Sequence, residues 1–183
     1  IVHEITKEKN QIAISFDDGF NGVYENIGII NKLKVPITIF VVSSFLDMDN
    51  FLTTNNLQEI AKNKFIKIQS HTFSHASLPT LSSDSLQKEL RESKQVLESI
   101  CETKIDSICF PKGLFDKLTI KKSSEVGYNK QFSSLPGSYY SEVFPSVKRR
   151  SLVQSVSEKE FKSILKGGDS ILYNWYYKKH FVR

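Results

Sequence analysis

Two aspartates and two histidines are the residues of this chain whose types and positions could do chemistry. Asp17 and Asp18 stand side by side directly after a short apolar run, and Gly19 follows them at once. His71 and His75, half of the four histidines in the chain, come soon after a later apolar run. Two carboxylates leaving one strand and two imidazoles leaving another are what a metal-activated hydrolase needs.

The two histidines predict a metal site if residues 70–78 turn helically, because side chains four apart then share one face. With one carboxylate they provide two nitrogens and one oxygen, and positions stay open for water and substrate. This donor set suits Zn²⁺, and Co²⁺, Ni²⁺ or Fe²⁺ fit it as well. The spacing alone is weak, since surface helices produce it by chance. Its position after one strand, opposite Asp-Asp-Gly after another, favours the metal.

Only one of the adjacent aspartates is expected to bind the ion. If both did, no base would remain, and two free carboxylates would repel each other. The carboxylate left ionised can take a proton from the water of the metal, whose pKa the cation lowers towards neutrality. An isolated Asp-Asp-Gly is as often a plain turn, and the residues alone do not say which aspartate takes which task.

Short β-branched runs alternate with helical patterns along the chain and must position these groups. Strands are expected at residues 12–16, 37–42, 65–69, 107–110, 128–132, 147–153 and 170–173. Helices are expected at residues 23–33, from residue 82 for about five turns, at 118–126 and at 158–165. Repeated units of this length predict an α/β domain over residues 1–183, with a mostly parallel sheet closed or partly closed into a barrel.

Three polar segments each follow an expected strand at once: Asp17-Asp18, residues 70–75 and residues 111–113. Parallel α/β folds place their functional loops at the carboxyl ends of the strands. The three segments are therefore expected to meet on one rim and to form an active site.

Composition excludes several classes of protein. With 183 residues, 39% of them hydrophobic and 25% charged, the chain matches one soluble globular domain. Its net charge of +5 comes from scattered lysines and arginines, so no nucleic-acid partner is expected. No apolar stretch is long enough for a transmembrane segment, and Cys101 and Cys109 make no disulfide scaffold. Because the chain opens with Ile1, an upstream segment is expected to be absent, and cell envelope, secreted and cytoplasmic locations all stay open.

Three motifs resemble those of the polysaccharide deacetylases, carbohydrate esterase family 4 with the NodB-homology fold. They are Ile-Ser-Phe-Asp-Asp-Gly at residues 14–19, Ser-His-Thr-Phe-Ser-His at residues 70–75 and Cys-Phe-Pro-Lys-Gly at residues 109–113. The third resembles the Phe-x-Pro-x-Gly form that marks one branch of the family, with Cys109 in the place of its phenylalanine. The match covers roughly the first 150 residues, in order. The resemblance implies a distorted (β/α) barrel with about seven strands.

The resemblance also implies roles for the first two motifs. Asp17 would be the general base, and Asp18, His71 and His75 would bind the metal. The reaction implied is hydrolysis of the acetamide on an N-acetylated sugar, with release of acetate.

The third motif is expected to contact the substrate through Pro111, Lys112 and Gly113. The family motif implies that the peptide N–H of Lys112 stabilises the oxyanion together with the ion.

Two departures from the family pattern affect the mechanism. Cys109 or its neighbours replace an arginine that holds the base in many members, and Arg149 or Arg150 could take over this task, with Arg149 favoured. No Leu-x-His motif occurs near residues 171–173, where a histidine usually protonates the leaving amine. Either Asp17, once protonated, also serves as the acid, or another group does.

Three functions are compatible with these residues. The first is a metal-dependent sugar N-deacetylase in bacterial surface-glycan assembly or modification, with an N-acetylated glycan or glycan precursor as its partner. The second is a catalytically impaired metal- and glycan-binding module of the same fold, suggested by the missing late histidine. The third is an amidase for a non-sugar amide. A groove lined by Trp175, Tyr176 and Tyr177 would favour sugar stacking over a small metabolite.

Overall fold

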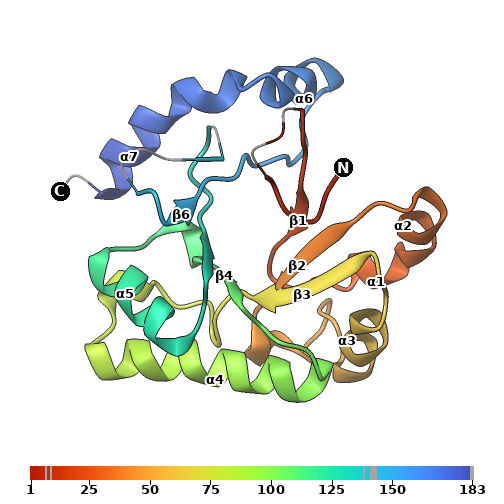
Figure 1. The fold of residues 1–183 in the computed structure, drawn as a ribbon, viewed down its shortest axis with the longest axis vertical. Coiled ribbons are helices and arrows are strands. Elements are labelled where there is room, and N and C mark those ends of the chain that lie inside the picture. The colour runs from red at the N-terminus through yellow and green to blue at the C-terminus, as the bar shows by residue number, and fades with distance from the viewer. Residues whose placement is uncertain (7, 9, 138, 141–143, 182–183) are drawn as a thin grey trace.

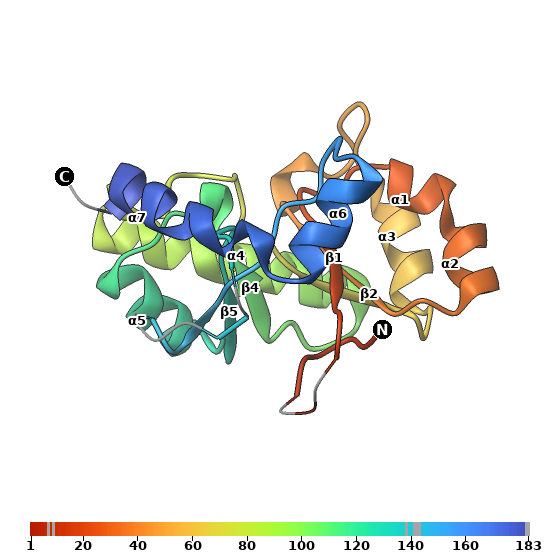
Figure 2. The same cartoon turned by 90° about the horizontal axis from the view of Figure 1, so that it is seen from above.

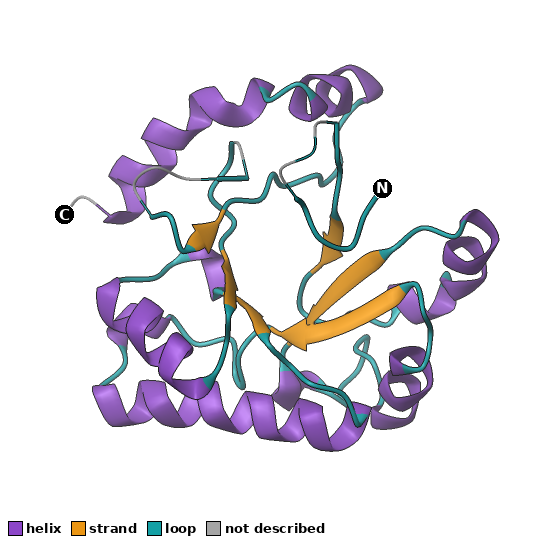
Figure 3. Ribbon diagram, viewed as in Figure 1, coloured by secondary structure: helices purple, strands orange, loops and turns teal. Residues whose placement is uncertain are grey.

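Six short strands form one parallel sheet in the computed structural model, which describes residues 1–6, 8, 10–137, 139–140 and 144–181. They are β1 (Ile14–Phe16), β2 (Ile37–Val41), β3 (Ile66–Ser70), β4 (Ser107–Cys109), β5 (Lys130–Phe132) and β6 (Val147–Lys148). Their order in the sheet is their order in the chain. The sheet curls so that its strands are arranged around the middle of the domain (Figure 3). The expected α/β fold with a parallel, partly closed barrel is therefore confirmed, with six strands where about seven were expected.

Helices cover the outside of the curl. They are α1 (Gly22–Glu25), α2 (Ile27–Leu33), α3 (Thr54–Ala61), α4 (Ser83–Cys101), α5 (Lys117–Val126), α6 (Glu158–Leu165) and α7 (Tyr173–Phe181). Helices α1 to α5 surround the sheet from β1 round to β5, and α6 and α7 cross the side where β6 and β1 face each other (Figure 1). Seen from above, α6 and α7 lie over the strands (Figure 2). No helix in the described part of the chain has the length and hydrophobicity needed to cross a bilayer.

The seventh strand expected at residues 170–173 does not form. Residues Gly168–Leu172 are a 3-10 helix that leads into α7. Ile171 is 83% exposed, so the short apolar run that suggested a strand is not buried. Tyr173 and Tyr176, three residues apart, pack against the core instead, which is the spacing of one helical face. The barrel consequently stays open between β6 and β1 within the described residues.

The long helix α4 confirms the expected helix of about five turns. Ser82 caps it by accepting a hydrogen bond from the Ser85 N–H. Leu86, Leu90 and Leu97 form the buried stripe that holds the helix against the sheet. The helices expected at residues 118–126 and 158–165 are also confirmed, as α5 and α6.

The helix expected at residues 23–33 is instead two helices, separated at Asn26. The Asn26 side-chain amide donates to the carbonyl of Gly22 at 2.8 Å, and its backbone leaves the helical region. Asparagine competes in this way with the helix's own hydrogen bonds. Helix α3 was not expected, although Thr53 and Asn56 form a capping box at its start.

Gln69 joins two strands that share little pairing. Strands β3 and β4 are in register only at Ser70 and Ile108. Gln69 is buried, and its side-chain oxygen Oε1 accepts hydrogen bonds from two backbone N–H groups. These are the N–H of Asp106, at 3.1 Å, and the N–H of Ser107, at 2.7 Å. These contacts fix the start of β4 beside the end of β3, where the second and third motifs begin.

Gln69→Met keeps the size of the side chain and leaves both N–H groups without an acceptor. We expect the free energy of unfolding to fall by about 3 kcal/mol, because each unsatisfied buried donor costs roughly 1–3 kcal/mol. Urea denaturation followed by circular dichroism measures this change. Gln58→Met, an exposed substitution on α3, is the matched control. Equal stability of the two variants would contradict the bridging role.

Candidate metal centre and active site

Asp18, His71 and His75 converge at the carboxyl ends of β1 and β3. The Oδ1 atom of Asp18 lies 3.5 Å from Nε2 of His71 and 3.4 Å from Nε2 of His75. This oxygen is buried and accepts no hydrogen bond from the described residues. A buried carboxylate oxygen facing two imidazole nitrogens, all within 4.8 Å of one another, fits the place of a divalent cation.

The histidines are not brought together by a helical turn, so this part of the expectation is wrong. Thr72 and His75 have φ values of 71° and 60°, which lie in the left-handed region. The loop is held by other parts of the chain: the carbonyl of Thr72 accepts from Ser43 N–H, and Glu89 accepts from Ser74. The Thr72 hydroxyl accepts from the His75 N–H at 3.2 Å. Tertiary contacts, and not helical periodicity, therefore place the two rings.

The hydrogen bonds of His71 prepare it as a ligand. Its Nδ1 lies 2.8 Å from the carbonyl oxygen of Cys109, which can only accept, so Nδ1 carries the proton and Nε2 presents its lone pair to Asp18. Burial lowers the pKa of His71, against the opposing effect of the nearby Asp17 carboxylate. The ring is consequently neutral near pH 7, as metal binding requires.

Asp17 is held by Arg150. The two guanidinium nitrogens donate to Oδ1 at 2.7 Å and to Oδ2 at 2.6 Å, a bidentate pair. Arg150 also donates to the Ser15 hydroxyl and lies over the ring of Phe40. The Arg150 side chain therefore connects two edges of the sheet. It starts from the segment after β6 and bonds residues in and just after β1, across the open side of the barrel.

The charge of Arg150 outweighs the burial of Asp17. Burial would raise the pKa of this carboxyl, but the attraction and hydrogen bonds of the guanidinium bring the pKa below its ordinary value. Asp17 is therefore ionised at neutral pH. Its Oδ2 lies 3.9 Å from Nε2 of His71, beside the position that the cation would take.

The expectation that Arg149 orients the base is wrong, because Arg150 takes that place. Neighbouring residues of an extended segment point to opposite sides. Arg150 faces the interior, and Arg149 lies over the ring of Tyr173 and donates to the carbonyl of Tyr140. Both arginines were candidates from the sequence. It contains no local signal that tells which of the two neighbouring side chains points to the interior.

A second set of donor atoms, from Asp17, His71 and Cys109, also lies within 4.8 Å. Both oxygens of Asp17 are already bound by Arg150. Burial raises the pKa of the Cys109 thiol well above its ordinary value, so a thiolate ligand is disfavoured. The set built on Asp18 is the better metal site.

The third motif, Pro111–Gly113, continues directly from β4 and forms a tight turn. Lys112 adopts the left-handed conformation, with φ 58°. The N–H groups of Gly113 and Leu114 donate to the carbonyls of Phe110 and Pro111, whereas no such bond engages the Lys112 N–H within the described residues. This peptide group is thus able to donate to a substrate.

A cavity of about 430 Å³ borders this turn. Lys112 and Gly113 line it together with Leu135, Asp169 and Tyr176. Trp175 lies outside the described lining and is 57% exposed. Of the aromatic group expected to form a groove, the structure therefore brings only Tyr176 to the third motif.

Each of the three motifs contains left-handed backbone, which also occurs at several other positions of the described chain. Asp18, Thr72, His75 and Lys112 all have positive φ without being glycine, and Thr72 is β-branched. Such conformations cost of order 1–3 kcal/mol each and persist where the surrounding structure determines them. Two of the three proposed metal ligands, Asp18 and His75, and the proposed substrate contact Lys112 are among them, which supports a preorganised site.

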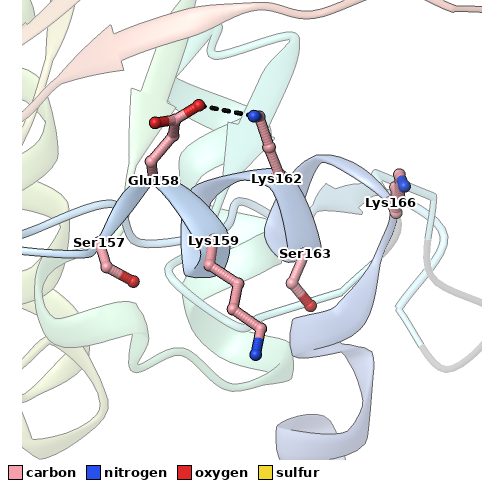
Figure 4. A pocket seen from close by; sticks show the side chains of 6 residues that line it. All are labelled: Ser157, Glu158, Lys159, Lys162, Ser163 and Lys166. Atoms are coloured by element: carbon pink, nitrogen blue, oxygen red, sulfur yellow. Dashed lines mark ion pairs between the residues drawn. The ribbon is translucent and has the colours of Figure 1, made fainter.

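A larger hollow of about 760 Å³ lies elsewhere, on the surface of α6 (Figure 4). Its side chains are those of Ser157, Glu158, Lys159, Lys162, Ser163 and Lys166. Lys162 pairs with Glu158, and no group of candidate metal ligands among the described residues includes any of these side chains. We therefore assign the active site to the three motifs at the carboxyl ends of β1, β3 and β4, and not to this hollow.

Comparison with known proteins finds related sequences and structures. The family model of polysaccharide deacetylases matches residues 4–130. The Bacillus subtilis protein YxkH is 28% identical over 127 residues, covering 69% of this chain and 45% of that protein. The poly-beta-1,6-N-acetyl-D-glucosamine N-deacetylase of Staphylococcus aureus is 26% identical over 136 residues, covering 66% of this chain and 47% of that protein. The chain thus spans about half the length of these curated relatives.

A solved structure, the Streptococcus pyogenes deacetylase PplD in complex with acetate, shares the fold with a TM-score of 0.77. Its sequence is 20% identical, and the match covers 87% of this chain and 72% of that one. The family match spans more than half of the chain and includes the first two motifs and the third. The chain belongs to the polysaccharide deacetylase family.

Proposed function

We propose that this chain removes the acetyl group from an N-acetylated sugar of a bacterial surface glycan or its precursor, with a divalent metal. The observation that carries the proposal is the convergence of Asp18, His71 and His75 beside an ionised Asp17. Family membership supports the reaction class.

The donor set favours Zn²⁺ as the ion. Two neutral imidazoles and one carboxylate leave coordination positions open, as in catalytic zinc sites, and Co²⁺, Ni²⁺ or Fe²⁺ accept the same donors. When bound, the ion supplies Lewis acidity towards the acetyl carbonyl and lowers the pKa of water.

Asp17 is the proposed general base. It takes a proton from the water that attacks the acetyl carbonyl, and Arg150 holds the carboxylate in place for this transfer. The Lys112 N–H donates to the carbonyl oxygen as negative charge develops there. Pro111 and Gly113 fix the turn that presents this N–H, and they contact the substrate beside it.

The alternative is a metal- and glycan-binding module without turnover. It is favoured by residues 171–173, which lack the Leu-x-His motif and form the end of a 3-10 helix and the start of α7. Turnover of any acetylated substrate eliminates this alternative, whereas binding of metal and glycan without turnover supports it.

The test measures both metal content and acetate release. We expect protein purified with added zinc or cobalt to hold about one ion per chain and to release acetate from N-acetylated oligosaccharides. His75→Ala removes one of three ligands, so the ion is lost on gel filtration and acetate release falls with it. His3→Ala is the matched control, because the hydrogen bond found for the His3 ring among the described residues is with the Lys64 carbonyl, outside the three motifs. If His75→Ala keeps its metal and activity, the proposed site is wrong.

A further inference from the structure

The two proposed histidine ligands are held in different ways. His71 directly follows β3, where its N–H donates to the Val41 carbonyl at 2.8 Å, and its side chain is only 3% exposed. His75 ends a loop of residues 71–75, which we call the histidine loop, and its side chain is 25% exposed. Its positive φ of 60° is a conformation that persists only where surrounding contacts enforce it. Those contacts therefore decide whether His75 stays beside Asp18.

Helix α4 contacts the histidine loop and the residue before it. The Ser93 hydroxyl, which is buried, lies 2.8 Å from the Ser70 hydroxyl, and the Ser70 hydroxyl accepts from the Thr72 N–H at 3.1 Å. One turn earlier on the same helix, Glu89 binds Ser74. The Ser74 N–H donates to one carboxylate oxygen at 2.6 Å, and the Ser74 hydroxyl lies 3.0 Å from each of the two oxygens. The helix thus holds the loop at both of its halves.

The turn of α4 that carries Glu89 is fixed in the core. Leu86 and Leu90, before and after it, are buried against the sheet, so the carboxylate extends from a rigid support. A charged acceptor forms shorter and stronger hydrogen bonds than a neutral one, which fits the short contact with the Ser74 N–H. Ser74 is thereby tied to the helix, and His75 follows it directly in the chain.

We propose that Glu89 is a positioning residue of the metal site, which holds Ser74 so that His75 is already in place when the cation binds. This inference rests on the metal site of the proposed function and adds to it a residue outside the candidate ligand set. The apparent dissociation constant of a site is the intrinsic constant divided by the fraction of molecules in the competent conformation. A histidine loop released from Glu89 spends part of its time with His75 away from Asp18, so the cation is bound more weakly.

The test measures metal affinity and needs no turnover. A chelating dye withdraws Zn²⁺ or Co²⁺ from the loaded protein, and the balance between the two gives the dissociation constant. We expect Glu89→Ala to raise this constant about tenfold, the lower end for contacts that orient metal ligands. The factor is the same for both ions, because the substitution acts on the loop and leaves the donor atoms unchanged.

Three further variants make the comparison specific. Glu89→Gln restores most of the affinity, since its side-chain oxygen still accepts from the Ser74 N–H. Ser74→Ala removes the hydroxyl contacts at an exposed residue, so it keeps the fold and weakens the binding of both ions in the same direction. Glu92→Ala is the matched control, because Glu92 lies on the same helix but pairs with Lys88.

The outcomes separate this inference from the proposed function. Equal affinities of the unchanged protein, Glu89→Ala and Ser74→Ala overturn the positioning role while the metal site stands. A loss that differs between Zn²⁺ and Co²⁺ also overturns it, because the donor atoms themselves would then have changed. A protein that binds neither ion overturns the metal site and this inference together.

Discussion

Asp17→Asn is expected to lower kcat/KM for acetate release by about 10²–10⁴-fold, the range for loss of a general base. The amide has nearly the size of the carboxylate but takes up no proton at neutral pH. Acetate release from N-acetylated oligosaccharides in the presence of zinc or cobalt measures the effect.

Metal content is the control for this variant. Asp18, His71 and His75 remain in Asp17→Asn, so about one ion per chain is expected to stay bound. Loss of the ion would make Asp17 a ligand and not a base. An unchanged rate would show that the assigned mechanism is wrong.

The missing late histidine bears on the second half of the reaction. In the described residues the segment expected to carry it is a 3-10 helix followed by α7. We propose that Asp17, once it has accepted a proton from water, returns that proton to the leaving amine. If one residue acts first as base and then as acid, the pH profile of kcat/KM is expected to show the pKa of one essential carboxyl group.

Strands β2 and β3 were predictable because each contains a local run of β-branched apolar residues. Strands β2 and β3 differ from the expected ranges by only one or two residues at their ends. Apolar β-branched runs between turn residues are a local signal, and parallel pairing follows from the helices between them. The run at residues 170–173 misled for the same reason: two apolar residues cannot show whether a sheet edge will bury them.

The site was predictable in its residue types and less so in its geometry. Motif resemblance pointed to Asp18, His71 and His75, and the structure brings these three together, while their roles remain predictions. The left-handed turns at Thr72 and His75 depend on contacts with distant segments such as residues 43–44. Long-range contacts of this kind leave no local pattern in the sequence.

Arg150 gives the second large prediction. It bonds Asp17 in a partly buried, bidentate pair in which the two side chains are 17% and 29% exposed. Breaking such a pair from one side leaves a buried charge without a partner. We expect Arg150→Gln to lower the free energy of unfolding by about 3 kcal/mol, the lower end for buried pairs because both groups keep some exposure.

The same substitution changes the protonation of Asp17. Without the guanidinium, burial dominates and raises the pKa of the carboxyl above 3.8, its ordinary value. The acidic limb of kcat/KM therefore moves to higher pH. The folded variant then binds its proton more tightly than the unfolded chain, so its stability falls as the pH rises and the deficit shrinks towards acidic pH.

Two further variants separate this pairing from a general loss of packing. The double variant Asp17→Asn, Arg150→Gln contains no unpaired charge and is expected to recover part of the lost stability. Arg149→Gln, next in the chain but facing Tyr173, is expected to leave the acidic limb of the pH profile in place. The comparison covers the unchanged protein, Arg150→Gln, the double variant and Arg149→Gln. Urea denaturation between pH 5 and 8 measures their stability, and pH profiles of acetate release locate the acidic limb. If Arg149→Gln shifts the acidic limb and Arg150→Gln does not, the pairing of Arg150 with the base is not the one that operates in catalysis.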